Sequence, residues 1–245
     1  MKKILITGGP TNEPIDEVMK ITNMSTGGMA VNLGRLFRSA GYEVILVLNN
    51  SVRAIEEENL RIVRVETTEE MMDAIEHEAQ ADDIDAVIHA AAVGDYKADF
   101  SFLMEDMAVE IFGQIDKIKS PDDILAIMKS PNCKLNSDTK ISSYQENLTI
   151  KLTLTPKIIG KLRFWFPKSL LIGFKLLEDV EKGELFDVAT ALCNKNGMDY
   201  IMANDLADLR TGHKERYLVN GEGFTQIVLN DYEAIFKFVD EKLSC

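Results

Sequence analysis

The sequence predicts an α/β protein built on a doubly wound, mostly parallel sheet, and three observations support this fold class. Short apolar runs alternate with amphipathic helical segments along about the first hundred residues. A glycine-bearing polar loop, residues 8–28, separates the first apolar run from the first helical segment. Further polar segments follow other predicted strands, at the carboxyl ends where open α/β sheets bind ligands.

The strands are expected where runs of aliphatic and β-branched residues are bounded by polar residues or glycine. These runs are residues 3–7, 43–48, 60–65, 85–90, 169–174 and 199–203. Residues 147–154 alternate apolar and polar side chains, which predicts a further strand. Two runs, 216–219 and 224–229, flank Asn220-Gly221 and predict a C-terminal β-hairpin.

The helices are expected between these strands. Apolar residues recur at helical spacing from Met29 to Phe37, and Gly41 is suited to end that helix. Thr67 and Glu70 form a capping-box pattern at the start of a helix that extends to residue 79. Further helices are expected to open at residues 156–159, to span 181–195, and to close the chain at 232–243.

The middle of the chain breaks this alternation. Residues 97–146 show no clear strand and only one helical piece, around residues 121–129. Long segments of this kind inside a compact domain are commonly functional lids. We therefore expect a single domain over residues 1–245, with a mobile flap or insert at about 97–146.

Composition excludes several classes of function. The formal net charge of −13 argues against nucleic-acid and anionic-membrane partners, which need a basic surface. No apolar run is long enough to cross a bilayer, and the first twenty or so residues lack a signal-peptide pattern. The cysteines, Cys133, Cys193 and Cys245, are scattered and odd in number, so reduced thiols in a cytoplasmic protein are expected.

Common nucleotide and metal motifs are absent from the sequence. It contains no G-x-x-x-x-G-K-[ST] motif, and Gly8-Gly9-Pro10 is not the G-x-G-x-x-G of dinucleotide-binding proteins. His77-Glu78 has no second histidine at zincin spacing, and His89 at a strand end is expected to be a packing residue. No metal site made of protein side chains is therefore predicted.

The loop before the first helix is the strongest candidate site. A helix N-terminus leaves backbone N–H groups unpaired and carries partial positive charge, so it attracts anions. Ser25 and Thr26 add hydroxyl groups, Gly27 allows close approach, and Asn23 adds an amide. An ordinary capped helix start is the alternative. Residues 91–96, 173–175 and 203–205 also follow predicted strands, so we expect one shared cleft.

A series of short motifs resembles one enzyme family, and the motifs occur in that family's order over nearly the whole chain. The chain resembles phosphopantothenate–cysteine ligases of coenzyme A biosynthesis, in their free-standing bacterial form, which have a Rossmann-like fold. The motifs are Ile6-Thr7-Gly8-Gly9, Glu13-Pro14-Ile15-Asp16, residues 21–27, Ala90-Ala91-Ala92-Val93-Gly94-Asp95-Tyr96, Lys140-Ile141-Ser142-Ser143, Thr155-Pro156-Lys157-Ile158-Ile159, Ile172-Gly173-Phe174-Lys175 and Ala203-Asn204-Asp205.

The resemblance implies a role for each matched residue. Asn23 would hold the activated acyl group, and Lys140 would act from the flap. Ala91 and Ala92 would bring backbone groups to the reacting centre. The residues implied in substrate binding are Gly8, Gly9, Ser25, Thr26 and Gly27. Those implied in nucleotide binding are Asp95, Pro156, Lys157, Ile158, Ile159, Phe174 and Lys195.

Some positions depart from the family pattern. Met19 stands where the family has an arginine, with Lys20 beside it, and Ala191 replaces a basic residue one turn before Lys195. Residues 117–119 mimic the flap motif, but the strand and Thr155-Pro156 that follow Lys140 keep the family order.

The resemblance also implies the chemistry. The substrates would be 4′-phosphopantothenate and L-cysteine, activated with CTP, or alternatively ATP, and Mg²⁺ through an acyl-nucleotide. A cytoplasmic homodimer is expected. An NAD(P)-dependent reductase or epimerase, and a non-catalytic nucleotide-binding protein of the same fold, remain as alternatives.

Overall fold

The computed structural model describes residues 1–213 and 215–244, so Cys245 lies outside the described residues. The chain divides into two compact units. The first contains residues 1–11, 23–93 and the described part of 156–245, and the second contains residues 12–22 and 94–155. Cys133 and Cys193 are free thiols. No helix in the described part of the chain has the length and apolar character needed to span a membrane.

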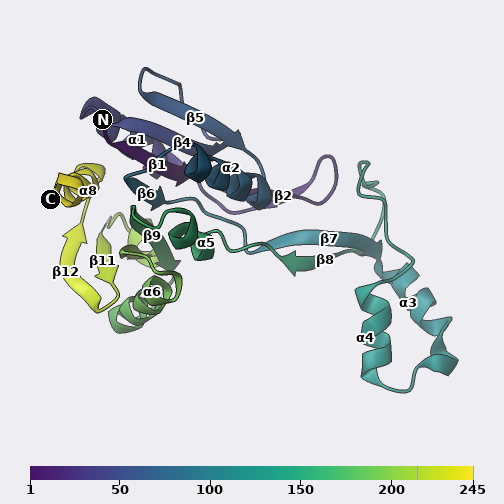
Figure 1. Cartoon of the computed structure of the whole chain (residues 1–245). Coiled ribbons are helices and arrows are strands. Elements are labelled where there is room, and N and C mark those ends of the chain that lie inside the picture. The colour runs from purple at the N-terminus through teal and green to yellow at the C-terminus, as the bar shows by residue number, and fades with distance from the viewer. Residues whose placement is uncertain (214, 245) are drawn as a thin grey trace. The chain divides into compact units, whose positions relative to one another are not determined.

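The first unit is built on a sheet whose strand order among the described residues is β12-β11-β10-β9-β6-β1-β4-β5 (Figure 1). Its strands are β1 (Lys3–Gly8), β4 (Glu43–Asn49), β5 (Leu60–Val65), β6 (Ala86–His89), β9 (Leu170–Leu177), β10 (Tyr200–Asp205), β11 (Arg216–Asn220) and β12 (Gly223–Leu229). Neighbouring strands from β5 to β10 are parallel, and β11 and β12 add an antiparallel hairpin at one edge. The predicted mostly parallel, doubly wound α/β sheet is confirmed.

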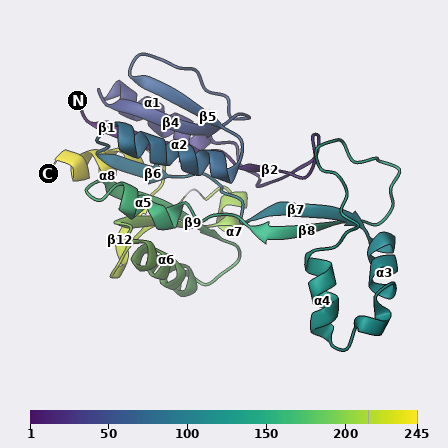
Figure 2. The same cartoon turned by 45° about the vertical axis from the view of Figure 1, so that its right-hand side comes forward.

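Helices cover both faces of this sheet (Figure 2). One face carries α1 (Gly28–Ser39) and α8 (Tyr232–Ser244), and the other carries α2 (Thr68–Ala81), α5 (Ile159–Trp165) and α6 (Lys182–Asn196). Successive strand side chains point to opposite faces, so Ile4 and Ile6 pack under α1 while Leu5 packs on the α2 side. The central strands are apolar on both faces because both faces are covered.

The second unit is a pair of small antiparallel sheets with a helical end. A short hairpin, β2 (Asn12–Pro14) and β3 (Lys20–Thr22), accompanies a ribbon of β7 (Tyr96–Leu103) and β8 (Leu148–Leu154). Between β7 and β8 lie α3 (Met104–Phe112), a 3₁₀ turn η1 (Ile115–Lys117) and α4 (Pro121–Lys129). A small core of Phe100, Phe102 and Met107 holds α3 to the ribbon.

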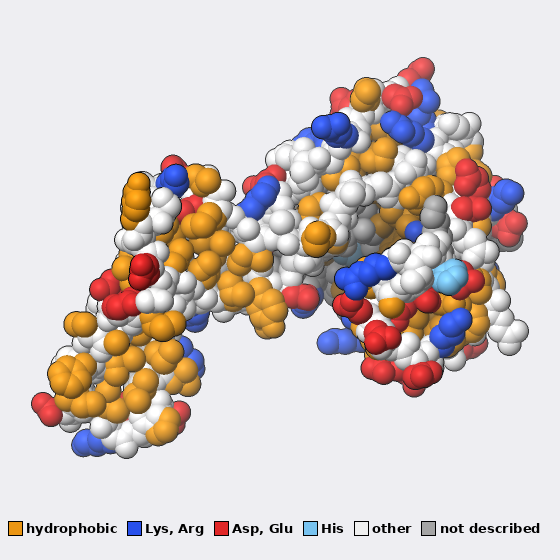
Figure 3. Space-filling model, turned by 180° about the vertical axis from the view of Figure 1, so that it is seen from behind, with side chains coloured by type: hydrophobic (Ala, Val, Ile, Leu, Met, Phe, Trp, Pro, Cys, Tyr) orange, Lys and Arg blue, Asp and Glu red, His pale blue; other side chains and the backbone are white. Residues whose placement is uncertain are grey.

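Exposed apolar side chains gather around α3 and α4, where the surface in Figure 3 is largely orange. They include Val109, Phe112, Ile115, Leu125 and Met128. These side chains are exposed among the described residues, and the expected homodimer stays a prediction.

Residues 97–146 differ from the expectation in one respect. The expected helix at 121–129 is confirmed as α4, but the expectation of no strand there is wrong, since β7 extends to Leu103 and pairs with β8. The alternation of Ala98, Phe100 and Phe102 with polar residues was the available signal. The polar residues Lys97 and Asp99 and the exposed Tyr96 hid this alternation, because a strand with so many polar residues lacks the apolar run that marks a buried strand. The single domain over 1–245 stays a prediction.

Candidate functional site

Two glycine-bearing turns meet at the carboxyl end of β1. Gly9 has φ +85° and Gly27, at the start of α1, has φ +70°. A Cβ on Gly9 would lie 2.5 Å from Val52 Cγ2, and one on Gly27 would lie 2.6 Å from the same atom and 3.2 Å from the Gly9 nitrogen. Glycine is required at both positions, because its backbone tolerates positive φ and only a bare Cα fits this approach.

The N-terminus of α1 has the features of an anion site. Its N-cap residue, Gly27, makes no side-chain cap bond, and its first turn holds no acidic residue. The Gly28 N–H donates to the Thr26 hydroxyl over 3.3 Å, and the Gly27 N–H donates to the Ser25 hydroxyl over 3.4 Å. The alternative of an ordinary capped helix start therefore stays open. A uniformly oriented set of N–H groups, with hydroxyls beside it, favours phosphate or carboxylate.

Asn23 connects this loop to the segment that follows β6. Its side-chain nitrogen donates to the carbonyl oxygens of Ala92 and Val93, at 3.1 Å each. Only the NH₂ end of the amide can face two carbonyl oxygens, so the neighbours determine the amide orientation. The structure therefore brings Asn23, Ala92, Gly9 and Gly27 together, and their roles in a site stay predictions.

The backbone of residues 91–93 is held from the β1 side as well. Ala92 N–H donates to the Gly9 carbonyl oxygen over 2.8 Å, and Ala91 N–H donates to the Thr7 hydroxyl over 3.2 Å. The N–H groups of both alanines therefore bond within the protein. Ala91 and Ala92 shape the centre through backbone position in this arrangement, rather than presenting these two donors to a ligand.

His89 is a buried packing residue, as expected for its place at the end of β6. Its Nδ1 lies 2.8 Å from the Thr7 hydroxyl, and only 7% of the residue is exposed. Burial lowers the pKa of His89 to about 4, because desolvation disfavours the charged imidazolium. The ring is neutral near pH 7, and its contact with the Thr7 hydroxyl holds the group that accepts from Ala91 N–H.

The residues expected around a nucleotide are only partly gathered. Pro156, Lys157, Ile158 and Ile159 lead into α5, but Ile158 is 1% exposed and belongs to the core on the α2 side of the sheet. Phe174 on β9 packs against the core on the α1 side. The Ile158 and Phe174 side chains therefore face opposite layers, and nucleotide contact by residues 156–159 and by Phe174 stays a prediction.

Lys195 is not brought to this edge of the sheet. It lies in the last turn of α6, the helix that connects the carboxyl end of β9 to the amino end of β10. Its neighbour Asn194 donates to the Gly221 carbonyl oxygen in the β11–β12 turn, at the same amino-terminal edge. Nucleotide contact by Lys195 stays a prediction, and the arrangement of the first unit does not support it.

Asp95 and Lys140 lie in the second unit. Asp95 directly precedes β7, and its carbonyl oxygen accepts from Thr155 N–H over 3.1 Å, next to the pair Tyr96–Leu154 at the end of the ribbon. Lys140 is exposed and begins a loop over residues 140–145, here named the Lys140 segment, whose next residue, Ile141, is 7% exposed. The roles carried to Asp95 and Lys140 by resemblance stay predictions.

Two supporting residues of the first unit lay outside the sequence prediction of site residues. Val52, after β4, fills the space against both Gly9 and Gly27. Arg64 on β5 donates to the carbonyl oxygens of Asn49, Val52 and Ala54 and so holds that loop. No local pattern marks Val52 or Arg64, because both act through contacts distant in sequence.

Asp205, the last residue of β10, holds the backbone on both sides of it. Its carboxylate accepts from the N–H groups of Asp179, Val180 and Ala207, and these bonds lower its pKa. No group of three or more acidic, histidine or cysteine side chains suited to a metal occurs in residues 1–213 and 215–244.

Comparison with known proteins identifies relatives of this chain. The model of the DNA/pantothenate metabolism flavoprotein C-terminal domain matches residues 1–103. The chain is 31% identical to the coenzyme A biosynthesis bifunctional protein CoaBC of Thermococcus kodakarensis over 218 residues, which are 89% of this chain and 45% of that protein. It thus spans less than half the length of this curated relative.

Solved structures share the fold. The DNA/pantothenate metabolism flavoprotein from Streptococcus pneumoniae has a TM-score of 0.80 and 31% identity, covering 100% of this chain and 99% of that chain. A Cab2 mutant in complex with phosphopantothenate-cysteine has a TM-score of 0.68, covering 99% of this chain and 86% of that chain. Its identity of 16% makes that second likeness one of fold alone.

Proposed function

The chain belongs to the family of the DNA/pantothenate metabolism flavoprotein C-terminal domain, and we propose on this basis that it is a phosphopantothenate–cysteine ligase. The observation that carries the proposal is the N-terminus of α1, with glycine and two hydroxyl groups at its start, preceded by a loop in which the Asn23 amide donates to Ala92. A phosphorylated acid needs such a site, because oriented backbone N–H groups favour its phosphate. The names of the relatives, which concern coenzyme A and pantothenate metabolism, agree with this assignment.

The proposed reaction has two steps. A carboxylate oxygen of 4′-phosphopantothenate attacks the α-phosphorus of CTP, the bond from that phosphorus to the β-phosphate oxygen breaks, and pyrophosphate leaves. The amine of L-cysteine then attacks the acyl carbon of the acyl-CMP and loses a proton, while the bond from carbon to the CMP oxygen breaks. The products are 4′-phosphopantothenoylcysteine, CMP and pyrophosphate.

The protein acts in this scheme by positioning and by neutralising charge. Gly8, Gly9, Ser25, Thr26 and Gly27 hold the substrate phosphate at the α1 N-terminus. Asn23 orients the acyl group, and Lys140 meets the charge that develops on the nucleotide phosphates. Mg²⁺ would neutralise part of the charge of the triphosphate. Positioning of this kind contributes much of the rate in reactions without a protein nucleophile.

The proposal is tested by pyrophosphate release. Purified protein is given Mg²⁺ and CTP, then ATP, each with and without 4′-phosphopantothenate and each with and without L-cysteine. We expect release with CTP only when 4′-phosphopantothenate is present, limited to about one equivalent per site without cysteine and continuous with it. Oxidation of NAD(P)H by the same preparation would instead support the reductase alternative.

The contrary outcome is equally clear. A chain that binds CTP, measured by calorimetry, but releases no pyrophosphate with either nucleotide is a non-catalytic nucleotide-binding protein. Gly27→Ala is the matched variant for the substrate phosphate. Sedimentation at several protein concentrations tests the proposed homodimer.

A further inference from the structure

The carboxylate of Asp16 connects two segments of the second unit that lie far apart in sequence. Its Oδ1 accepts from Val18 N–H over 2.7 Å and from Met19 N–H over 2.6 Å. Its Oδ2 accepts from Ile141 N–H over 2.8 Å, across 125 positions of the chain. Only 6% of Asp16 is exposed, so the carboxylate is shielded from competing water.

The two oxygens serve different structures. Oδ1 closes the turn between β2 and β3, where the Met19 carbonyl oxygen also accepts from Ile15 N–H. A turn of this kind needs only one acceptor oxygen. Oδ2 is used for the backbone immediately after Lys140, so the second oxygen has a purpose that the turn does not require.

Other contacts make this connection durable. The three N–H donors, with the positive charge of Lys140 as a smaller contribution, lower the pKa of Asp16, so the carboxylate stays ionised and accepting near pH 7. Ile141 is itself buried, which anchors the Lys140 segment beside the bond. Val18, Met19 and Leu148 line one hollow with that segment.

We propose that Asp16 is the positioning residue for Lys140, fixing the backbone from which that lysine reaches the nucleotide. The inference rests on the proposed ligase function for its catalytic part. Thr22 ends β3 and Asn23 follows it directly in the chain, so the hairpin tied to the Lys140 segment is continuous with the loop that begins at Asn23. Asp16 thus holds the backbone after Lys140 to the β2–β3 hairpin, and the chain runs from that hairpin directly into the loop that begins at Asn23.

Asp16→Asn is the sharpest test variant. Asparagine has nearly the same shape but one acceptor oxygen, and its NH₂ would face an N–H group. It can satisfy the turn or Ile141, but not both. Asp123→Asn is the matched control, because the Asp123 carboxylate also accepts from backbone N–H groups, those of Lys119 and Ser120, at the start of α4 in the same unit.

Limited digestion with trypsin tests the contact without using activity. Trypsin cleaves after lysine, so the bond between Lys140 and Ile141 reports how often the segment opens. We expect Asp16→Asn to raise the rate of cleavage at this bond about tenfold, because that rate depends on the population of the open segment. Mass spectrometry of the fragments measures it. Asp123→Asn should leave that bond at the parent rate. An unchanged rate in Asp16→Asn would overturn the proposal.

Kinetics then test whether the effect passes through Lys140. Displacement by about 1 Å can lower a rate about 10²-fold, so we expect that loss in kcat for pyrophosphate release in Asp16→Asn, with the KM for 4′-phosphopantothenate unchanged. In the background of Lys140→Ala the same substitution should add little, because the group it positions is gone. Full additivity, or a matching loss in Asp123→Asn, would show a general structural effect and reject the positioning role.

The two arms separate the possible failures. If the parent chain releases no pyrophosphate, the ligase proposal fails, and the digestion still decides whether Asp16 holds the Lys140 segment. If the parent is active and Asp16→Asn is cleaved at the parent rate, the ligase stands and the positioning role is refuted.

Discussion

The side-chain amide of Asn23 donates to the carbonyl oxygen of Ala92 over 3.1 Å, across 69 positions of the chain. With its second bond to Val93, the amide joins the loop before α1 to the segment after β6. The segment after β6 leaves the carboxyl end of a strand that pairs with β1, so this contact joins the loop before α1 to that edge of the sheet. An isosteric carboxylate would place oxygen against two carbonyl oxygens, which makes the amide nitrogen specific to this position.

Asn23→Ala should slow the second half-reaction more than the first. The variant loses the amide that orients the acyl group, and loss of one such group typically costs about 10²–10³-fold in rate. Acyl-CMP should then accumulate, measured by rapid quenching with labelled CTP. Asn196→Ala is the control, since that amide donates to the Leu192 carbonyl oxygen within α6. Equal slowing of both steps would contradict the assigned role.

Lys140→Ala should slow the first half-reaction, because the lysine is proposed to meet charge on the departing pyrophosphate. We expect a loss of about 10²-fold or more in the rate of pyrophosphate release, measured in single turnover without cysteine. Lys117→Ala, in the similar sequence at η1, is the matched control and should retain parent activity. Loss in the Lys117 variant with a normal Lys140 variant would reverse the assignment.

Gly27→Ala should weaken binding of 4′-phosphopantothenate. The variant has a strained positive φ and a Cβ that meets Val52 and the Gly9 nitrogen, so the two turns must separate. We expect the KM for this substrate to rise about tenfold or more, since phosphate contacts depend on that approach. Gly41→Ala is the control, because Gly41 also has a positive φ, +87°, but a Cβ there would meet nothing within 4 Å. This variant should be strained in the same way without a rise in KM.

Acid should destabilise the fold through His89. Its pKa of about 4 in the folded chain lies below the ordinary histidine value of 6.5, so the unfolded chain binds the proton first as the pH falls. Stability is therefore full above pH 6.5 and is lost on descent towards pH 4, by about 2–3 kcal/mol between pH 7 and 4.5. His89→Asn should flatten denaturant midpoints over that range, whereas His77→Asn, at an exposed position, should keep the parent slope.

The carboxylates act in a lower pH window. Folding lowers the pKa values of Asp16, Glu110, Asp123 and Asp205 through hydrogen bonds from backbone N–H groups. The stability they contribute is lost only as the pH falls below their ordinary pKa values, 3.8 for Asp and 4.5 for Glu. A slope between pH 6.5 and 4.5 that persists in His89→Asn would show that other groups carry it.

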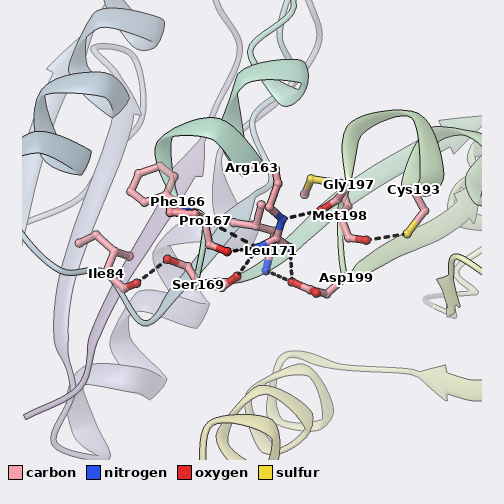
Figure 4. A network of polar contacts seen from close by, with 10 residues as sticks. All are labelled: Ile84, Arg163, Phe166, Pro167, Ser169, Leu171, Cys193, Gly197, Met198 and Asp199. Atoms are coloured by element: carbon pink, nitrogen blue, oxygen red, sulfur yellow. Dashed lines mark hydrogen bonds and ion pairs between the residues drawn. The ribbon is translucent and has the colours of Figure 1, made fainter.

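Arg163→Ala should destabilise the first unit without entering the site. Arg163 donates to the carbonyl oxygens of Gly197 and Ser169, and pairs with Asp199 over 2.7 Å, at the amino ends of β9 and β10 (Figure 4). We expect the free energy of unfolding to fall by roughly 2–3 kcal/mol, because the variant loses several hydrogen bonds from a charged donor. The fall is no larger, since the Asp199 pair is partly exposed and the carbonyl groups can bond to water instead. Denaturant unfolding measures it, with exposed Lys168→Ala as the control.

Much of the fold could be predicted from local pattern. The apolar runs of β1, β4 and β9 and the helical spacing of α1 are properties of neighbouring residues, and alternation along the chain implies a parallel sheet. The position of Lys195 could also have been deduced, since a helix between two parallel strands must end at their amino edge. β7 could not be recognised so easily, because its apolar side chains are interleaved with charges.

Local spacing along the sequence was enough to predict the order along the chain of the strands in the large sheet, the glycines of the two turns, and the polar segments that follow those strands. Tertiary structure alone decided that the Asn23 nitrogen faces two carbonyl oxygens, that His89 is buried beside Thr7, and that Asp16 reaches Ile141. These contacts join residues 69, 82 and 125 positions apart, and no periodicity along the chain encodes a pairing of that range.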